Sequence, residues 1–223
     1  MIRHFFLIRF NMNTTDEGWL KQRISLFERF TLSSLHDQTN KNYRVILFCD
    51  ERTTESWKRV IESYRFDIEW THRKWFDSES VVVNEAVSKR ITNSEDIIIT
   101  TRLDNDDAIC RSFVDRTQKA AKVNHVISFP LGYLYKNGKI YLHDFTGNHF
   151  LSYVSSSNDI KTIFCGNHMR LPSRYPCISI RDAVGWMEVI HDKNLKNTLA
   201  RRDLHDDSPT IDLEEVRKEF RFI

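Results

Sequence analysis

Length, composition and charge already exclude several classes of protein. The 223 residues, 40% of them hydrophobic, are enough for one soluble domain with a substantial core. The 33 lysines and arginines nearly balance the 31 aspartates and glutamates, so the net charge of +2 gives no global basic field for nucleic acid or an anionic membrane. Four widely spaced cysteines and the lack of an apolar run near ~20 residues indicate a cytoplasmic protein with reduced thiols and no membrane span.

The first hundred residues alternate β-rich runs with segments of helical period. The β-rich runs are "HFFLIRF" (4–10), "YRVILFCD" (43–50), "FDIEWTH" (66–72) and "DIIITT" (96–101). Segment 17–39 places Leu20, Ile24 and Phe27 on one helical face, and a second helix is expected in 55–64. Segment 78–91 is a third helix candidate, but its β-branched residues leave the assignment ambiguous. Strands that alternate with helices predict a βαβ protein with a largely parallel sheet.

The pattern changes after residue 107. Ser112 is expected to cap a helix that runs to Val123, and Asn137-Gly138 predicts a hairpin between "GYLYKNG" and "KIYLHDF". Residues 155–178 are rich in Ser, Asn, Pro and Gly and are expected to form mostly loops, whereas Asp212 predicts the start of a short C-terminal helix. The second half is therefore expected to be mixed rather than parallel.

A cluster of carboxylates, "LDNDD" (103–107), follows the fourth β-rich run. Ligands of open parallel α/β sheets bind beyond the carboxyl ends of strands, and carboxylates this close repel one another unless a cation lies among them. Oxygen ligands suit Mg²⁺ or Mn²⁺, which take one or two carboxylates while substrate phosphates complete the shell. A calcium EF-hand does not fit, because the sixth position from Asp104 is Ile109 rather than glycine. Turn formation by solvated aspartates is the competing interpretation.

Several phrases then carry a family resemblance. "TLSSLHDQTNKNYRVILFCD" (31–50) followed by "TRLDNDDAI" (101–109) resembles the nucleotide-sugar glycosyltransferases of the GT-A fold. More narrowly, "HFFLIRFN", "RLDNDDA" and "WMEVIHDKN" (186–194) resemble the rhamnosyltransferase family. The resemblance implies a Rossmann-like α/β fold with a mostly parallel central sheet, helices on both faces and a mixed C-terminal half. It also implies a single domain, 1–223, in which 1–107 bind the nucleotide sugar and 108–223 bind the acceptor.

The resemblance implies a donor site at the ends of three predicted strands. Asp104 is expected to contact the ribose or a metal-bound water, and Asp50 the base or ribose. Phe10 would lie against the base, and Arg9 would meet a carbonyl or phosphate oxygen. Arg102 is expected to clamp the diphosphate or to fix the aspartates. Strand-end salt bridges are the alternative for both arginines.

The same resemblance implies a site for Mn²⁺ or Mg²⁺. Asp104 and Asp106 match the D-x-D pair, with Asp106 in direct contact with the metal and Asp107 in support. His191 is expected to complete the metal site, because many GT-A enzymes use a histidine late in the chain; a structural histidine is the alternative. His168 and His205 are the competing histidines.

Sugar transfer also needs charge stabilisation at the leaving phosphate and, when the configuration inverts, a base. Asp182 is the candidate base because it lies late in the chain before an expected helix, and Asp144 is the second choice. Arg181 stands where inverting families usually have glutamate, so a retaining mechanism stays open, and helix capping is the alternative role of Asp182. Trp186 is expected to shape the acceptor pocket, with core packing as the alternative, whereas core packing is favoured for Met187.

The function implied is metal-dependent hexosyl transfer, with rhamnose suggested by the family name. The donor would be a nucleoside-diphosphate sugar with UDP, GDP or dTDP, and the acceptor a saccharide or glycan. A non-catalytic carbohydrate-binding module is the alternative. A phosphohydrolase or nucleotidyltransferase is less favoured, because "RFNMNTTDEGW" (9–19) contains one glycine, Gly18, where related nucleotidyltransferases have a glycine-rich loop.

Overall fold

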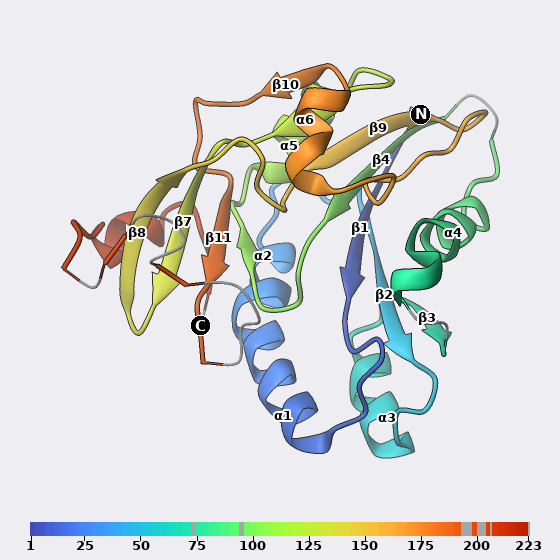
Figure 1. The fold of residues 1–223 in the computed structure, drawn as a ribbon, viewed down its shortest axis with the longest axis horizontal. Helices are drawn as coiled ribbons and strands as arrows, with labels where there is room; N and C mark the ends of the chain where they lie inside the picture. Colours follow the sequence, from blue (N-terminus) through green and yellow to red (C-terminus); the bar gives the residue numbers. More distant parts are fainter. Residues whose placement is uncertain (73–74, 94–95, 193–197, 200–203, 206, 223) are drawn as a thin grey trace.

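The computed structural model describes residues 1–72, 75–93, 96–192, 198–199, 204–205 and 207–222, and these residues form a mixed α/β structure with two sheets (Figure 1). The strands are β1 (Ile2–Arg9), β2 (Arg44–Asp50), β3 (Asp67–Thr71), β4 (Ile97–Arg102), β5 (Ala108–Ile109), β6 (Val126–Ser128), β7 (Leu131–Lys136), β8 (Lys139–Asp144), β9 (Ser152–Ser156), β10 (Cys177–Ser179) and β11 (Trp186–Val189). The helices are α1 (Glu17–Leu26), η1 (Phe27–Leu32), α2 (Ser33–His36), α3 (Glu55–Ser63), α4 (Trp75–Ser88), α5 (Phe113–Lys119), η2 (His168–Arg170), α6 (Leu171–Arg174) and α7 (Leu213–Val216).

The larger sheet has seven strands in the order β10-β6-β9-β4-β1-β2-β3. β1 lies between β2 and β4 and is parallel to both, and β3 continues the parallel set beside β2. β9 runs antiparallel to β4 and β6. The four strands expected in the first hundred residues and the largely parallel arrangement are confirmed.

The smaller sheet has the order β5-β11-β7-β8. β7 and β8 form the predicted hairpin, and its two turn residues, Asn137 (φ 49°) and Gly138 (φ 82°), both adopt the left-handed conformation that such a turn requires. β11 pairs in parallel with β7. Because β11 is a strand, the expectation that Asp182 precedes a helix is wrong.

The helical predictions are right in position and less so in extent. Segment 17–36 is α-helical in α1 and α2, but η1 between them is a π-helix. Asp16 caps α1 by accepting the Trp19 N–H (2.6 Å), and Asp212 caps α7 by accepting the Glu214 N–H (2.7 Å). The helix after Ser112 ends at Lys119 rather than near Val123. The region expected as loops contains η2, α6 and β10.

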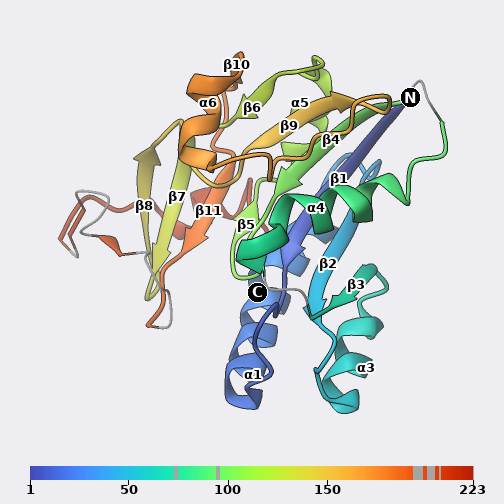
Figure 2. The same cartoon turned by 45° about the vertical axis from the view of Figure 1, so that its right-hand side comes forward.

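Alternate residues of β1 pack into two different layers. Phe5 and Leu7 lie on the face of the sheet that α4 covers, and they are buried there together with Val83 and Val87 (Figure 2). Phe6 and Ile8 face the opposite layer, whose buried residues come from η1, α5 and the smaller sheet and include Phe27, Phe113 and Trp186. In both views the smaller sheet lies to one side of the larger sheet, away from α3.

This topology brings the carboxyl ends of β1, β2 and β4 to one edge, because parallel strands end on the same side. Arg9, Asp50 and Arg102 are the last residues of these strands. Among the described residues, helices long and apolar enough to cross a membrane are absent.

Candidate active site

The carboxylate loop, residues 103–107, is anchored on both sides. The Leu103 N–H donates to Leu7 O (3.4 Å), and the Asn105 side chain donates to Phe10 O, which ties the loop to the end of β1. On the other side, Thr31 Oγ1 of η1 donates to Asp107 O (2.8 Å). The loop is therefore held in place before any ligand binds.

Asp104 lies between two arginines. Its Oδ1 is 3.3 Å from Arg9 Nη2, and its Oδ2 is 3.1 Å from Arg102 Nη2. Burial acts to raise the pKa of Asp104, but the positive charges of Arg102 and Arg9 outweigh it and hold the pKa well below its usual range. Asp104 is therefore ionised, and both guanidinium groups stay next to it.

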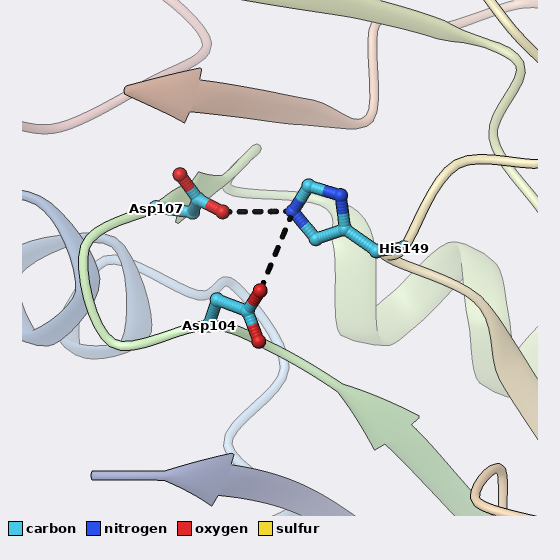
Figure 3. A group of neighbouring side chains, drawn as sticks. All are labelled: Asp104, Asp107 and His149. Atoms are coloured by element: carbon cyan, nitrogen blue, oxygen red, sulfur yellow. Dashed lines mark hydrogen bonds and ion pairs between the residues drawn. The ribbon is translucent and has the colours of Figure 1, made fainter. Parts of the chain in front are cut away.

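Asp107 is enclosed on both sides. Its Oδ1 accepts the Val189 N–H at the end of β11 (2.8 Å), and its Oδ2 lies 2.8 Å from His149 Nε2 (Figure 3). The same nitrogen is 3.9 Å from Asp104 Oδ2, and one ligand atom each from Asp104, Asp107 and His149 lie within 4.8 Å of one another. Within the described chain, these three residues could hold a metal ion.

Charges within this group shift both pKa values upward. Burial and the neighbouring charge of Asp106 raise the pKa of Asp107 to about 7. Burial alone would lower the pKa of His149, but the hydrogen bond with Asp107 and the charge of Asp104 raise it. The repulsion between the Asp106 and Asp107 carboxylates is what a bound cation would relieve.

Asp106 faces a different histidine. Its Oδ2 lies 2.9 Å from His191 Nε2, beyond the end of β11, so the structure brings these two predicted residues together. The same oxygen forms an ion pair with Arg23 of α1, whose guanidinium lies over the Trp19 ring at 4.9 Å.

In both histidine–aspartate pairs the N···O spacing is that of an ordinary hydrogen bond, and it is also compatible with two adjacent ligands of a hexacoordinate divalent cation. Adjacent ligands at ~2.1 Å from an octahedral ion are separated by roughly 3 Å, close to the 2.9 Å between Asp106 Oδ2 and His191 Nε2 and the 2.8 Å between Asp107 Oδ2 and His149 Nε2. The carboxylate donors suit Mg²⁺, Ca²⁺ or Mn²⁺, whereas an imidazole donor is more typical of Zn²⁺, Cu²⁺, Fe²⁺ or Ni²⁺.

A cavity of about 400 Å³ is lined by Arg9 and Arg102, which both contact Asp104. Its other lining residues belong to segment 163–168 and include Phe164 and His168. Arg102 Nη1 donates to His168 Nδ1 (3.2 Å), and burial together with the charge of Arg102 lowers the pKa of His168 to about 3. A neutral His168 can accept this bond, so it positions Arg102 at the cavity wall.

Two predicted contact residues, Phe10 and Trp186, are placed differently from the expectation, whereas Met187 is in the core as favoured. Phe10 is 1% exposed and packs edge-on against Phe27, so it lies in the core rather than against a base. Trp186 is also 1% exposed, stacks on Phe150 and donates its Nε1–H to Phe129 O, which leaves no ring face for an acceptor. Met187 is buried beside it.

Asp50 ends β2 as expected, but Arg52 occupies its carboxylate. Arg52 Nε and Nη2 donate to the two carboxylate oxygens at 2.9 and 2.7 Å, and these bonds lower the pKa of Asp50. Arg52 would have to release this carboxylate before a ribose or base could contact Asp50.

The two candidate bases are exposed and paired with arginines. Asp182, 73% exposed, accepts a 2.7 Å bond from Arg116, which lowers its pKa, and Asp144 accepts a 2.8 Å bond from Arg181. His205 is exposed, and its backbone N–H donates to Ser208 Oγ. Lys193 and Asn194, the end of the phrase that contains His191, lie outside the described residues.

Sequence reasoning missed His149, Arg23 and Phe164. His149 lies three residues before the start of β9, and its pairing with Asp107 joins residues 42 positions apart. Arg23 sits on an ordinary amphipathic helix, and its partner is 83 positions away in sequence. The one available signal was Arg23 four residues after Trp19, a spacing that puts both side chains on one helix face.

Comparisons with known proteins agree with this fold. A family model described as "Putative rhamnosyl transferase" matches residues 9–203. Among solved structures, S. aureus TarS matches with a TM-score of 0.52 and 12% identity over 85% of this chain and 37% of that chain. A structure of TarS 1–349 gives 0.52 and 11% identity over 85% and 60%. Curated proteins yielded no match.

The chain therefore spans between 37% and 60% of the TarS chains that it matches. At this identity the likeness shows the fold alone. Together with the strand order, it confirms the GT-A architecture expected from the sequence.

Proposed function

Because the chain belongs to the family described as "Putative rhamnosyl transferase", we propose that it is a metal-dependent glycosyltransferase. It transfers a hexose from a nucleoside diphosphate (UDP, GDP or dTDP) to a saccharide or glycan acceptor. The family's description suggests that this hexose is rhamnose. The observation that carries the proposal is the cavity at the edge of the parallel sheet, where two arginines meet an ionised aspartate. Donor binding in such a position is typical of open α/β sheets.

Arg9 and Arg102 bind the donor diphosphate in this proposal. Both guanidinium groups line the cavity, and both contact Asp104, which fixes their orientation. A guanidinium fork matches two phosphate oxygens and stays charged at any physiological pH. The two arginines thus stabilise the negative charge that builds on the leaving diphosphate during transfer.

Asp106 and His191 bind the divalent cation, with Asp104 acting through a bound water. Asp107 is a weaker candidate ligand, because its side chain is 2% exposed against 9% for Asp106. The set Asp104–Asp107–His149 is the alternative that its converging ligand atoms support. When bound, a divalent cation supplies Lewis-acid stabilisation of the leaving phosphate.

Asp182 is the proposed base for an inverting reaction, and Asp144 is the second choice. Each carboxylate accepts a hydrogen bond from an arginine, and the bond from Arg116 lowers the pKa of Asp182, so Asp182 is ionised as a base must be. Asp182→Asn and Asp144→Asn, assayed for transfer, measure what each contributes.

The test of the function is turnover of a donor panel. UDP-, GDP- and dTDP-rhamnose are each incubated with Mn²⁺. The nucleoside diphosphate that is released when the sugar is transferred to water or to an added saccharide is measured. We expect turnover of one donor, dependence on Mn²⁺, and a loss of roughly 100-fold in Asp106→Asn. If a folded protein turns over no donor in the panel while binding a saccharide without metal, the carbohydrate-binding module is the better account.

A further inference from the structure

Arg23 occupies a position that the proposed reaction does not explain. Its Nη1 pairs with Asp106 Oδ2, and the two side chains are 11% and 9% exposed. The same oxygen is 2.9 Å from His191 Nε2. The Arg23 guanidinium and the proposed metal ligand His191 therefore both contact one oxygen of Asp106, at a position largely shielded from solvent.

A divalent ion bound by Asp106 and His191 would need the oxygen that Arg23 now holds. Two positive charges at one oxygen repel each other strongly where water is largely excluded. Arg23 and the ion therefore cannot both contact this oxygen at full strength. Any gain in binding for one is a loss for the other, because coupling between two binding events is reciprocal.

We propose that Arg23 is the resident counter-ion of Asp106, which competes with the divalent cation and so sets the affinity of the site for it. This inference rests on the proposed function, in which Asp106 is a metal ligand. In the metal-free protein Arg23 keeps Asp106 neutralised and pointed at His191. When the cation binds, the guanidinium withdraws from that oxygen.

The Trp19 ring can hold the Arg23 guanidinium after it leaves Asp106. Its ring lies 4.9 Å from the Arg23 guanidinium carbon, and it is one helical turn before Arg23 on α1. A cation over an aromatic face is stabilised without a carboxylate. The displaced side chain therefore keeps one of its two partners, which lowers the cost of the exchange.

The test is the affinity for Mn²⁺ alone, by calorimetry, in the full chain without nucleotide. Arg23→Gln should bind Mn²⁺ about tenfold more tightly than the unaltered protein, since the competitor is gone, within the usual range of such couplings. Arg29→Gln is the matched control: Arg29 also lies over an aromatic ring, Phe30, and bonds to Tyr135 rather than to a carboxylate of the site. Its Mn²⁺ affinity should be unchanged.

Two further variants test whether the gain in Mn²⁺ affinity acts through Asp106 and whether it depends on the charge of Arg23. Arg23→Gln combined with Asp106→Asn should show none of the tenfold gain, because the gain acts through Asp106. Arg23→Lys keeps the charge but loses the guanidinium fork, so its Mn²⁺ affinity should fall between those of the unaltered protein and Arg23→Gln. If circular dichroism shows that Arg23→Gln is unfolded, Arg23→Lys serves in its place. The metal-free Arg23→Gln protein should also melt at a lower temperature than the unaltered protein.

An unchanged or weaker Mn²⁺ affinity in folded Arg23→Gln overturns the inference while leaving the proposed function intact. A gain that persists in the double variant also overturns it. If the unaltered, folded protein binds no Mn²⁺ at all, the proposed metal dependence fails and the inference falls with it, so the two failures are distinguishable.

Discussion

His4 is a buried histidine at the start of β1, remote in sequence from the carboxylate loop. It is 2% exposed, stacks on Phe6 with ring centroids 4.9 Å apart, and its Nε2 lies 2.7 Å from Thr101 Oγ1. Burial lowers its pKa from 6.5 to about 3, so the folded protein holds a neutral imidazole.

This shift makes the stability of the fold depend on pH. The unfolded chain takes up the His4 proton near pH 6.5, whereas the folded chain takes it up only near pH 3. The contribution is fully present above pH 6.5 and is lost as pH falls between these values, at up to about 1.4 kcal/mol per pH unit. Between pH 7.5 and 5 we expect a loss of about 2 kcal/mol in the free energy of unfolding, measured in urea. His4→Gln should remove that part of the pH dependence; equal slopes in both proteins would contradict the assignment.

Single residues of the site differed in how far the sequence could reveal them. Asp104, Asp106 and His191 stand in phrases that resemble a family, and the structure places Asp106 against His191. The packing of Phe10 and Trp186 could not be read from residue type, because an aromatic side chain suits a core and a binding surface equally well. Arg23 could not be predicted as a site residue, because its partner is fixed by tertiary structure.

At the scale of elements, the Trp186 indole of β11 lies against Gly132 of the neighbouring strand β7 and leaves no room for a side chain there. A Cβ atom added to Gly132 of β7 would lie 2.1 Å from Trp186 Cδ2 of β11. Gly18 of α1 is a contrasting position, where the nearest atom to such a Cβ is Asp16 Oδ1 at 3.5 Å.

The two glycines should therefore respond to alanine in opposite directions. Gly132→Ala should lower the free energy of unfolding by about 1–3 kcal/mol through overpacking. Gly18→Ala should raise it by about 0.5 kcal/mol, since alanine is the better helix former. Urea unfolding of both variants measures these free energies. A Gly132→Ala protein as stable as the parent would show that Trp186 of β11 packs less closely against Gly132 of β7 than described.

Elements with a regular apolar period were predictable, and those with polar interiors were not. The strands β1 to β4 were identified from their apolar runs, whereas β9, "SYVSS", reads as a loop. Its Ser152 is nonetheless buried, and the hydroxyl lies 2.6 Å from Thr101 Oγ1 of β4, so a hydroxyl pair replaces an apolar contact. The π-helix η1 likewise left no mark in a continuous helical period.

At the scale of the molecule, the site is assembled where the two sheets meet. The carboxylate loop follows β4 of the larger sheet, His149 precedes β9, and Val189 and His191 come from the end of β11 in the smaller sheet. The sequence predicted the fold class and the edge of the sheet at which the site lies. It could not predict which histidine pairs with which aspartate, because that depends on how the second sheet is placed against the first.

The most direct test of the central claim is calorimetry of UDP, GDP and dTDP, each with and without Mn²⁺. The account predicts that one nucleotide binds only in the presence of Mn²⁺. It also predicts that His191→Gln weakens this binding at least about tenfold, whereas His149→Gln, its matched control, keeps it. The opposite response of the two variants would assign the cation to Asp104, Asp107 and His149. No binding of any nucleotide to the folded protein, with or without Mn²⁺, would contradict the claim that this edge of the sheet is a donor site.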